Sequence, residues 1–174
     1  ANNTADFLNS LSSSGVALIG IEPSMTLAYQ SEYKKLLGDK APTVLLIQQW
    51  LNLQNIQTKH SLFNPTKFKL LAHCTEKTNA AASMKDWVAV FEKLNQSIVI
   101  MDTGCCGMSG TYGHEKNNLQ TSKRIYQLSW SDIVNNPDNK DQLMATGYSC
   151  RSQVKREDDK QLPHPLQALL QQLA

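Results

Sequence analysis

The alternation of short apolar runs with amphipathic segments constrains the fold of this chain most strongly. Residues 16–21, 67–74, 97–101 and 142–147 have the composition and length of buried strands. Helical segments separate them, most clearly at residues 80–94, where apolar side chains recur at steps of three and four. Strands separated by helices predict an α/β fold with a parallel sheet that is flanked by helices on both faces.

Five more helices are expected from apolar spacing and from proline at a first helical position. Two of them span residues 25–37 and 114–130, and a short one is opened by Cys150. Another is opened by Pro42 and contains Val44, Leu45, Trp50 and Leu51. The last follows Pro165 and has an apolar stripe of Leu166, Leu169, Leu170 and Leu173.

Every cysteine of the chain comes after a predicted strand. Cys74 ends the run 67–74, Cys105 and Cys106 follow the run 97–101, and Cys150 follows the fourth run. The carboxyl ends of parallel strands lie at one edge of a sheet, where ligands bind in such folds. We therefore expect the four thiols to lie together at the carboxyl edge of the sheet.

Four converging thiols predict a metal or redox site. Thiolates are soft ligands that suit an iron–sulfur cluster or zinc. The loop that carries Cys105 and Cys106 has glycine at every third position, which lets backbone amides turn toward the sulfurs. We expect Cys74, Cys105, Cys106 and Cys150 to be the ligands, with His73, Gly104, Gly107 and His114 around them.

Three alternatives to a metal site remain open. Buried cysteines can pack as small hydrophobes, and either histidine can be an ordinary residue near the sheet edge. A glycine-rich loop between a strand and a helix can bind phosphate, although the spacing G-x-x-G here differs from G-x-G-x-x-G. Cys105 or Cys106 can be the nucleophile of a thiol–disulfide enzyme, although the chain has no C-x-x-C motif.

Composition excludes several other classes. The 17 Lys and Arg residues nearly balance the 15 Asp and Glu residues, so no nucleic-acid partner is expected. No apolar run reaches the ~20 residues that a membrane span needs. The polar start of the sequence lacks the features of a secretion signal, which favours reduced thiols over a disulfide framework. The chain has no initiator methionine, and we expect it to be a fragment of a longer protein.

Several motifs resemble the cysteine-rich domain that is named for its Cys-Cys-Gly sequence. This domain occurs in heterodisulfide reductases and in the iron–sulfur subunits of glycolate oxidase and anaerobic glycerol-3-phosphate dehydrogenase. The combination most resembles the C-terminal part of bacterial FAD- and iron–sulfur-containing D-2-hydroxyglutarate dehydrogenase-like proteins. The matching motifs are GIEPS at 20–24, HC at 73–74, DTGCCGMSGTYGHE at 102–115, SW at 129–130, TGYSCRSQVKR at 146–156 and HPLQALL at 164–170.

The resemblance implies a Rossmann-like cysteine-rich fold and an electron-transfer role in an FAD-linked 2-hydroxy-acid dehydrogenase. Residues 1–60 would be the tail of a first cysteine-rich repeat and residues 61–174 a second repeat. The flavin and ferredoxin-like domains of the parent chain would be partners, and a quinone or another molecule would accept electrons. The fragment itself is not expected to be catalytic. It would be cytoplasmic, with contact at the inner face of the membrane as a further expectation.

Two positions depart from the family pattern. Met25 stands where relatives carry a cysteine after the GIEPS serine, and Gln153 replaces the second cysteine of a C-x-x-C motif that begins at Cys150. The alternatives for the site are therefore one four-iron–four-sulfur cluster, a zinc ion, or a structural module without metal that docks other parts of the same enzyme.

Overall fold

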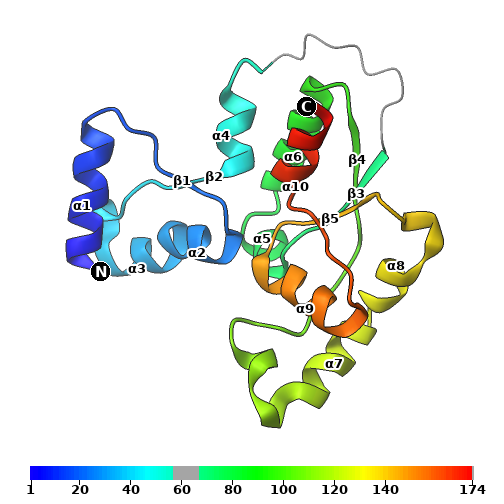
Figure 1. The fold of residues 1–174 in the computed structure, drawn as a ribbon. Coiled ribbons are helices and arrows are strands. Elements are labelled where there is room, and N and C mark those ends of the chain that lie inside the picture. The colour runs from blue at the N-terminus through cyan, green and yellow to red at the C-terminus, as the bar shows by residue number, and fades with distance from the viewer. Residues whose placement is uncertain (57–66, 174) are drawn as a thin grey trace.

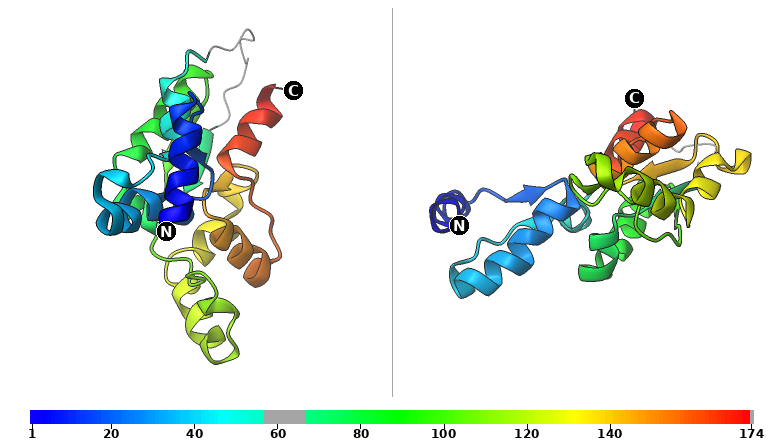
Figure 2. Two further views of the ribbon diagram at one scale, coloured as in Figure 1. Left: turned by 90° about the vertical axis from the view of Figure 1, so that its left-hand side faces the viewer. Right: turned by 90° about the horizontal axis from the view of Figure 1, so that it is seen from below.

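The computed structural model describes residues 1–56 and 67–173. A smaller N-terminal lobe with α1, α2, α3, β1 and β2 lies beside a larger lobe that is built around β3, β4 and β5 (Figures 1 and 2). The expected boundary between residues 60 and 61 falls outside the described residues. The helices are α1 (Asn2–Ser13), α2 (Pro23–Ala28), α3 (Lys34–Leu37), α4 (Ile47–Leu53), α5 (Cys74–Asn79), α6 (Ser83–Lys93), α7 (Leu119–Gln127), α8 (Ser131–Asn135), α9 (Tyr148–Asp158) and α10 (Pro165–Leu173), and the strands are β1 (Ile19–Gly20), β2 (Leu45–Leu46), β3 (Lys67–Leu71), β4 (Ser97–Ile100) and β5 (Leu143–Ala145).

The described strands form two parallel sheets. In the smaller sheet β1 pairs with β2, with Ile19 opposite Leu45. In the larger sheet β3 is central, and Leu70 lies opposite Ile100 of β4 and Met144 of β5. The predicted α/β fold with parallel strands and flanking helices is confirmed.

The core has one part on each face of the larger sheet because side chains alternate along a strand. Phe68 and Leu70 of β3 pack with Trp87 and Phe91 of α6 on one face, which α4 and α10 also cover. Leu71 of β3 belongs to the second part of the core, with side chains from β5 and the helices α7, α8 and α9: Leu143, Ala145, Tyr126, Trp130, Val134, Cys150 and Val154. Figure 1 shows these two helix groups on opposite sides of the sheet.

The helix expected to begin at Pro42 begins later. Leu45 lies in β2, and α4 starts at Ile47. The side-chain oxygen of Gln49 accepts a hydrogen bond from the Leu46 amide at 2.9 Å, which fixes the helix start there. The apolar run of Val44 and Leu45 satisfied a helical and an extended pattern equally, and its pairing with β1 selects the strand.

Three other helix predictions also need correction. The expected helix 114–130 is interrupted, because Glu115 is extended between two 3₁₀ turns and α7 starts only at Leu119. The helix with Cys150 begins two residues earlier, at Tyr148. Leu170 was expected to contribute to the core through the last helix, but its side chain is 65% exposed. The sequence pattern predicted none of α1, α5 and α8, and Cys74, expected at the end of a strand, is the first residue of α5.

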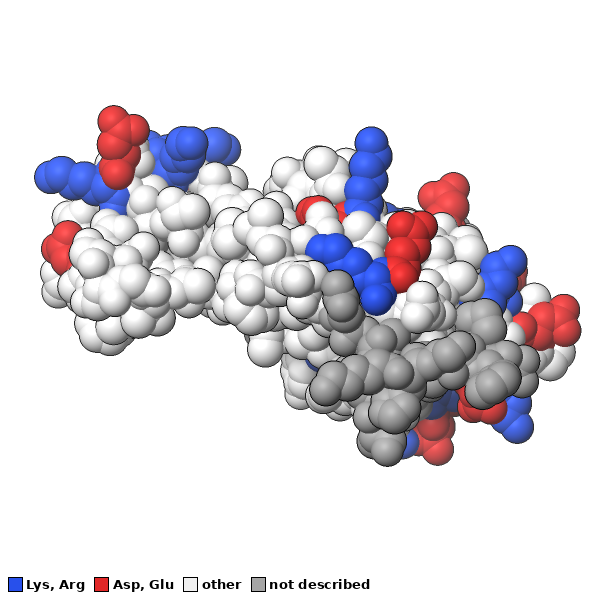
Figure 3. Space-filling view, turned by 90° about the horizontal axis from the view of Figure 1, so that it is seen from above, with Lys and Arg blue, Asp and Glu red and all other residues white. Residues whose placement is uncertain are grey.

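The surface shows no continuous basic area on the face drawn in Figure 3, where blue and red side chains are interspersed. This distribution agrees with the near balance of charged residues in the sequence. In residues 1–56 and 67–173, no helix combines the length and apolar character required to cross a bilayer.

Candidate functional site: the cysteine row

The four cysteines occupy the first turns or loops that follow the strands of the larger sheet. Cys74 is the first residue of α5, after β3, and Cys150 lies in the first turn of α9, after β5. Cys105 and Cys106 lie in the loop after β4. All four are free thiols; Cys74 and Cys105 are partly exposed, whereas Cys106 and Cys150 are buried.

The thiols interact in sequence as a row, which we call the cysteine row: Cys74, Cys105, Cys106, Cys150. Hydrogen bonding with the Cys105 thiol, together with burial, raises the pKa of Cys74 well above its usual range. The interaction with Cys105 lowers the pKa of Cys106, but hydrogen bonding with Cys150 and burial outweigh it and raise that pKa to about 12. The pKa of Cys74 therefore responds to Cys105, and the pKa of Cys106 responds to both Cys105 and Cys150.

Backbone amides of the glycine loop point at the two middle sulfurs. The Gly107 amide donates a hydrogen bond to Cys105 Sγ at 3.3 Å. A backbone hydrogen bond from Met108 lowers the pKa of Cys106, against the larger effects that raise it. Amide donors stabilise negative charge on sulfur, so this loop has the electrostatic character that the glycine pattern predicted.

The residues Ser129 and Trp130 hold the start of the cysteine loop. Ser129 Oγ accepts a hydrogen bond from the Gly104 amide at 2.9 Å, and Trp130 Nε1 donates one to the Gly104 carbonyl at 3.1 Å. Trp130 is fully buried in the core. The Ser-Trp pair singled out in the sequence thus fixes the backbone one residue before Cys105.

The middle of the loop lies directly against α7. Gly107 has a φ of +89°, and a Cβ atom there would lie 2.2 Å from the Ser122 carbonyl oxygen. The Gln153 side-chain amide donates to Ser122 Oγ at 3.1 Å, and Arg156 donates to both Ser122 Oγ and the Gly113 carbonyl. Gln153, at the position of a family cysteine, is completely buried and joins α9 to α7 behind the loop.

The two histidines expected near the site have different surroundings. His73 is buried and caps α5, since its Nδ1 accepts a hydrogen bond from the Thr75 amide at 3.2 Å. Its Nε2 lies 3.4 Å from Ser149 Oγ, beside the turn that leads to Cys150. His114 is exposed on the 3₁₀ turn Tyr112–His114.

A buried carboxyl group that the sequence analysis missed lies beneath the row. Glu76 is fully buried and accepts hydrogen bonds from Gln48 at 2.7 Å, Trp87 at 3.3 Å and Thr146 at 2.7 Å. Thr146 in turn accepts from the His73 amide at 2.9 Å. Burial raises the pKa of Glu76 against the effect of these donors. A polar Thr-Glu-Lys sequence carried no signal that its glutamate is buried.

Glu22 of the GIEPS motif connects the N-terminal lobe to the helix that carries Cys150. One carboxylate oxygen accepts a hydrogen bond from the Tyr148 amide at 2.8 Å, and the other accepts from Ser24 Oγ at 3.1 Å. Tyr148 is the first residue of α9, so the carboxylate satisfies a free amide at the helix start. Met25, at the other departure from the family pattern, is 64% exposed.

The four thiols are ligands that suit soft metals, but they are not arranged around a common point. Four thiols along one edge, two of them facing amide donors, are ligands of the type that hold iron–sulfur centres or zinc. Within residues 1–56 and 67–173, no group of three or more His, Cys, Asp or Glu side chains is positioned to hold a metal ion. The thiols would have to turn toward a common point, and the metal site stays a prediction.

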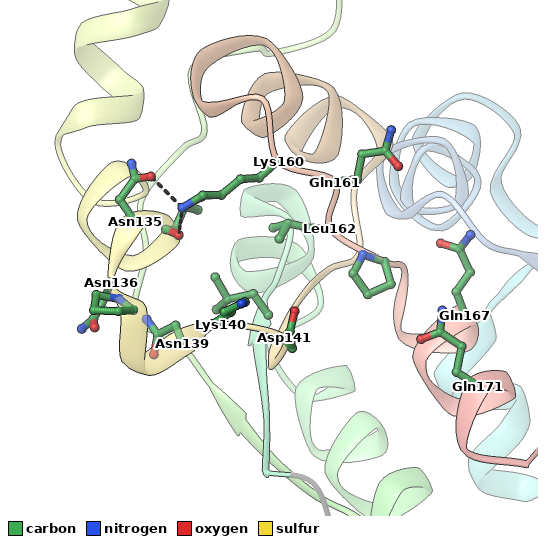
Figure 4. Close-up of a pocket in the computed structure, with 14 residues that line it drawn as sticks. Asn135, Asn136, Asn139, Lys140, Asp141, Lys160, Gln161, Leu162, Gln167 and Gln171 are labelled. Carbon is green, nitrogen blue, oxygen red and sulfur yellow. Dashed lines mark hydrogen bonds between the residues drawn. The ribbon is translucent and has the colours of Figure 1, made fainter.

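A cavity of about 820 Å³ lies away from these thiols. It borders the residues that lead into β5, whereas Cys150 follows the opposite end of that strand. Its lining is rich in amide side chains, and Lys160 reaches across to Asn135 at 2.8 Å (Figure 4). None of the residues expected at the metal site lines this cavity.

The fold and the thiols together define a cysteine-bearing α/β domain, and comparisons with known proteins agree. The chain is 46% identical over 172 residues to a D-2-hydroxyglutarate dehydrogenase from Pseudomonas putida, and 39% identical over 174 residues to one from Escherichia coli. Each match covers 98% of this chain and 17% of the relative. These matches confirm the predicted resemblance to the C-terminal part of D-2-hydroxyglutarate dehydrogenase-like proteins.

A second, more distant similarity is to a subunit of another dehydrogenase. One of the subunits of anaerobic glycerol-3-phosphate dehydrogenase from Escherichia coli is 24% identical over 169 residues, which cover 92% of this chain and 41% of the relative. No family model and no solved structure matches the chain.

Proposed function

We propose that this chain is the electron-transfer part of a larger FAD-linked 2-hydroxy-acid dehydrogenase of the D-2-hydroxyglutarate, D-lactate or glycolate type. In this proposal Cys74, Cys105, Cys106 and Cys150 hold one four-iron–four-sulfur cluster. The observation that carries it is the cysteine row at the sheet edge, with amides of Gly107 and Met108 directed at its middle sulfurs. The similarity to D-2-hydroxyglutarate dehydrogenases over 98% of the chain supports the choice of enzyme.

The parent enzyme supplies the rest of the proposed reaction. FAD, bound outside this chain, would accept electrons from the hydroxy acid, and this chain would pass them to a quinone or another acceptor. Its partners would be the flavin and ferredoxin-like domains of the same polypeptide, with residues 1–60 and 61–174 as parts of two cysteine-rich repeats. A cytoplasmic location belongs to the proposal, whereas the expected contact with the membrane surface finds no support among the described residues.

The residues of the chain would contribute binding and electrostatics to this role. The four thiols would supply every ligand, since Met25 and Gln153 offer a thioether and an amide, which bind iron weakly beside thiolate. The loop amides would stabilise the negative charge of the thiolate-ligated centre. The hydrogen bonds that Ser129 and Trp130 make to Gly104 would hold the loop in position.

A structural module that binds zinc or no metal is the second candidate. It is favoured by the burial of Cys106 and Cys150, which are 2% and 1% exposed and pack among the apolar side chains of the second core. Buried thiols can act there as small hydrophobes that stabilise the core of a docking module.

Metal analysis of anaerobically purified protein separates the two candidates. The proposal predicts iron and sulfide with a brown visible spectrum, and loss of both when any one of the four cysteines is replaced by serine. Met25→Ser is the matched control, because it changes an exposed sulfur side chain outside the row and should leave the iron content unchanged. Stoichiometric zinc, or a colourless protein with unchanged stability after chelation, would favour the structural module.

A further inference from the structure

The smaller sheet of the N-terminal lobe is too narrow to be stable alone. Among residues 1–56 and 67–173 it consists of two strands only, β1 and β2, which run in parallel. Parallel sheets are generally covered on both faces, and a unit of two strands is marginally stable in water without further strands or packing. The two edges of this sheet therefore decide whether it can accept another strand.

The outer edge of β2 is closed by side chains of the same lobe. The Val44 carbonyl accepts a hydrogen bond from Gln30 Nε2 at 2.7 Å, and the Leu46 amide donates one to Gln49 Oε1 at 2.9 Å. Leu45, which lies between these two residues, pairs with β1. A further strand on this side would have to displace both glutamine side chains.

The outer edge of β1 is open. The Leu18 carbonyl accepts a hydrogen bond from the Leu45 amide at 2.9 Å, and the register directs the backbone of Gly20 toward β2 as well. Because backbone groups alternate in direction along a strand, the amide and the carbonyl of Ile19 point away from β2. Within the described parts of the chain, no hydrogen bond joins these two groups to another residue. An unpaired edge of this kind can bind another strand.

A largely apolar groove of about 480 Å³, which we call the β1 groove, follows the open edge. Residues 17–22 line it one after another, so it runs along the edge of the strand and not over one face alone. Ile21 and Met25 are 56% and 64% exposed, which leaves apolar side chains of the groove in contact with water. The remaining lining residues are Leu8 of α1, Thr26 of α2, Tyr29 and Val44.

We propose that the β1 groove binds an extended segment of the polypeptide that precedes residue 1 in the full-length enzyme. The segment adds a third strand to the sheet: its backbone pairs with Ile19, and its alternate apolar side chains pack against Ile21 and Met25. This inference rests on the part of the proposed function that makes the chain one section of a longer enzyme. It is independent of what the cysteine row binds.

The position of the N-terminus favours a segment of the same polypeptide. The chain covers 17% of the D-2-hydroxyglutarate dehydrogenases that it matches and corresponds to their C-terminal part. Its N-terminus lies in the lobe that carries the β1 groove, whereas its C-terminus lies in the larger lobe (Figure 1). A segment joined to α1 therefore has a high effective concentration at the groove.

A second copy of the chain fits the groove less well. Two copies that paired through their open edges would share only the short strand β1 (Ile19–Gly20). Stable interfaces between proteins bury about 800 Å² on each partner, which so short an edge does not provide.

Hydrogen exchange tests the pairing by comparison of the full-length enzyme with the 174-residue chain. In the full-length enzyme, the peptide of residues 17–22 should exchange about tenfold more slowly, because the outward amide gains a hydrogen-bond partner. The peptide of residues 67–71 is the control, since β3 already has a neighbour on both sides and should exchange alike in both proteins. Equal exchange of residues 17–22 in the two proteins would overturn the proposal.

Photocrosslinking in the full-length enzyme identifies the occupant of the groove. Met25 is replaced by the photoreactive amino acid p-benzoylphenylalanine, and the crosslinked peptides are sequenced. We expect a crosslink within one polypeptide, to a segment that precedes residue 1. A crosslink to a second copy, crosslinks confined to residues 1–174, or no crosslink at all would contradict the proposed occupant.

A charge in the groove tests the apolar contact. Ile21→Asp should restore fast exchange of residues 17–22 in the full-length enzyme. Leu36→Asp is the matched control, because Leu36 is 71% exposed in the same lobe but does not line the groove, and exchange should stay slow. Equal exchange in the two variants would refute the contact.

The iron content of the same full-length samples separates this inference from the proposed function. Slow exchange of residues 17–22 in a protein without iron would support the groove and count against the electron-transfer role. Fast exchange in a protein with its full iron content would overturn the groove alone.

Discussion

His164, at the start of α10, provides a stability prediction with a defined pH range. The residue is 5% exposed, and its ring lies 5.9 Å from that of Trp87. Its Nδ1 accepts a hydrogen bond from the Leu166 amide at 3.2 Å, while its Nε2 has no hydrogen-bond partner within the described residues. Burial, with a smaller effect from the charge of Arg151, lowers the pKa of His164 to about 4.

The direction and size of the effect follow from this depressed pKa. In the unfolded chain the histidine has a pKa of 6.5, so between pH 6.5 and about 4 the unfolded state binds more protons than the folded state. The contribution of neutral His164 is complete above pH 6.5 and is lost as the pH falls. At about 1.4 kcal/mol per pH unit, the free energy of unfolding falls by about 3 kcal/mol over this range.

The assay is urea unfolding between pH 7 and pH 4, monitored by tryptophan fluorescence, for the wild type and for His164→Asn. Asparagine keeps a side-chain oxygen that can cap α10 but has no titrating group. The stability difference between the two proteins should therefore shift by about 3 kcal/mol in favour of the variant as the pH falls. A difference that stays constant with pH would refute the assignment of a buried, neutral histidine.

Three further substitutions test the packing around the cysteine loop and beneath it. Gly107→Ala should destabilise the fold by about 3 kcal/mol, because the backbone there has a positive φ and the added Cβ atom would clash with α7. The control Gly110→Ala also has a positive φ but open space around it, and should cost only about 1 kcal/mol. Equal unfolding midpoints of the two variants in urea would contradict this prediction. Glu76→Ala leaves three buried donors without their acceptor and should cost about 3 kcal/mol, against less than about 0.5 kcal/mol for the exposed control Glu92→Ala. Trp130→Phe removes the bond to the loop carbonyl, so amide exchange in residues 102–107 should rise measurably, and unchanged exchange would show that this bond does not hold the loop.

The sequence predicted the larger sheet well because its pattern reports burial directly. Leu70 and Leu71 of the central strand, and Ala72 directly after it, pack alternately into the two parts of the core, so this run is continuously apolar, as expected for a strand covered on both sides. The same pattern failed at Val44 and Leu45, since a short apolar run fits a strand or a helix and only pairing with β1 decides between them.

The site could be predicted only in part, because the residues that support it have ordinary surface character in the sequence. Glu76 and Gln153 are polar residues that become fully buried through partners distant in sequence, such as Thr146 and Ser122. The sequence predicted that each cysteine follows a strand, because this depends only on the order of segments along the chain. The positions of the thiols relative to one another depend on how the loop packs against α7 and α9, which no local pattern encodes.

The central claim is that this chain carries electrons through its cysteine edge, and electron paramagnetic resonance of the full-length parent enzyme tests it most directly. After anaerobic addition of D-2-hydroxyglutarate, the account predicts flavin reduction followed by a reduced iron–sulfur signal, one component of which is absent in Cys150→Ser. Flavin reduction should persist in that variant, because the proposal assigns the flavin to another part of the polypeptide. An identical iron–sulfur signal in Cys150→Ser and the wild type would contradict the account.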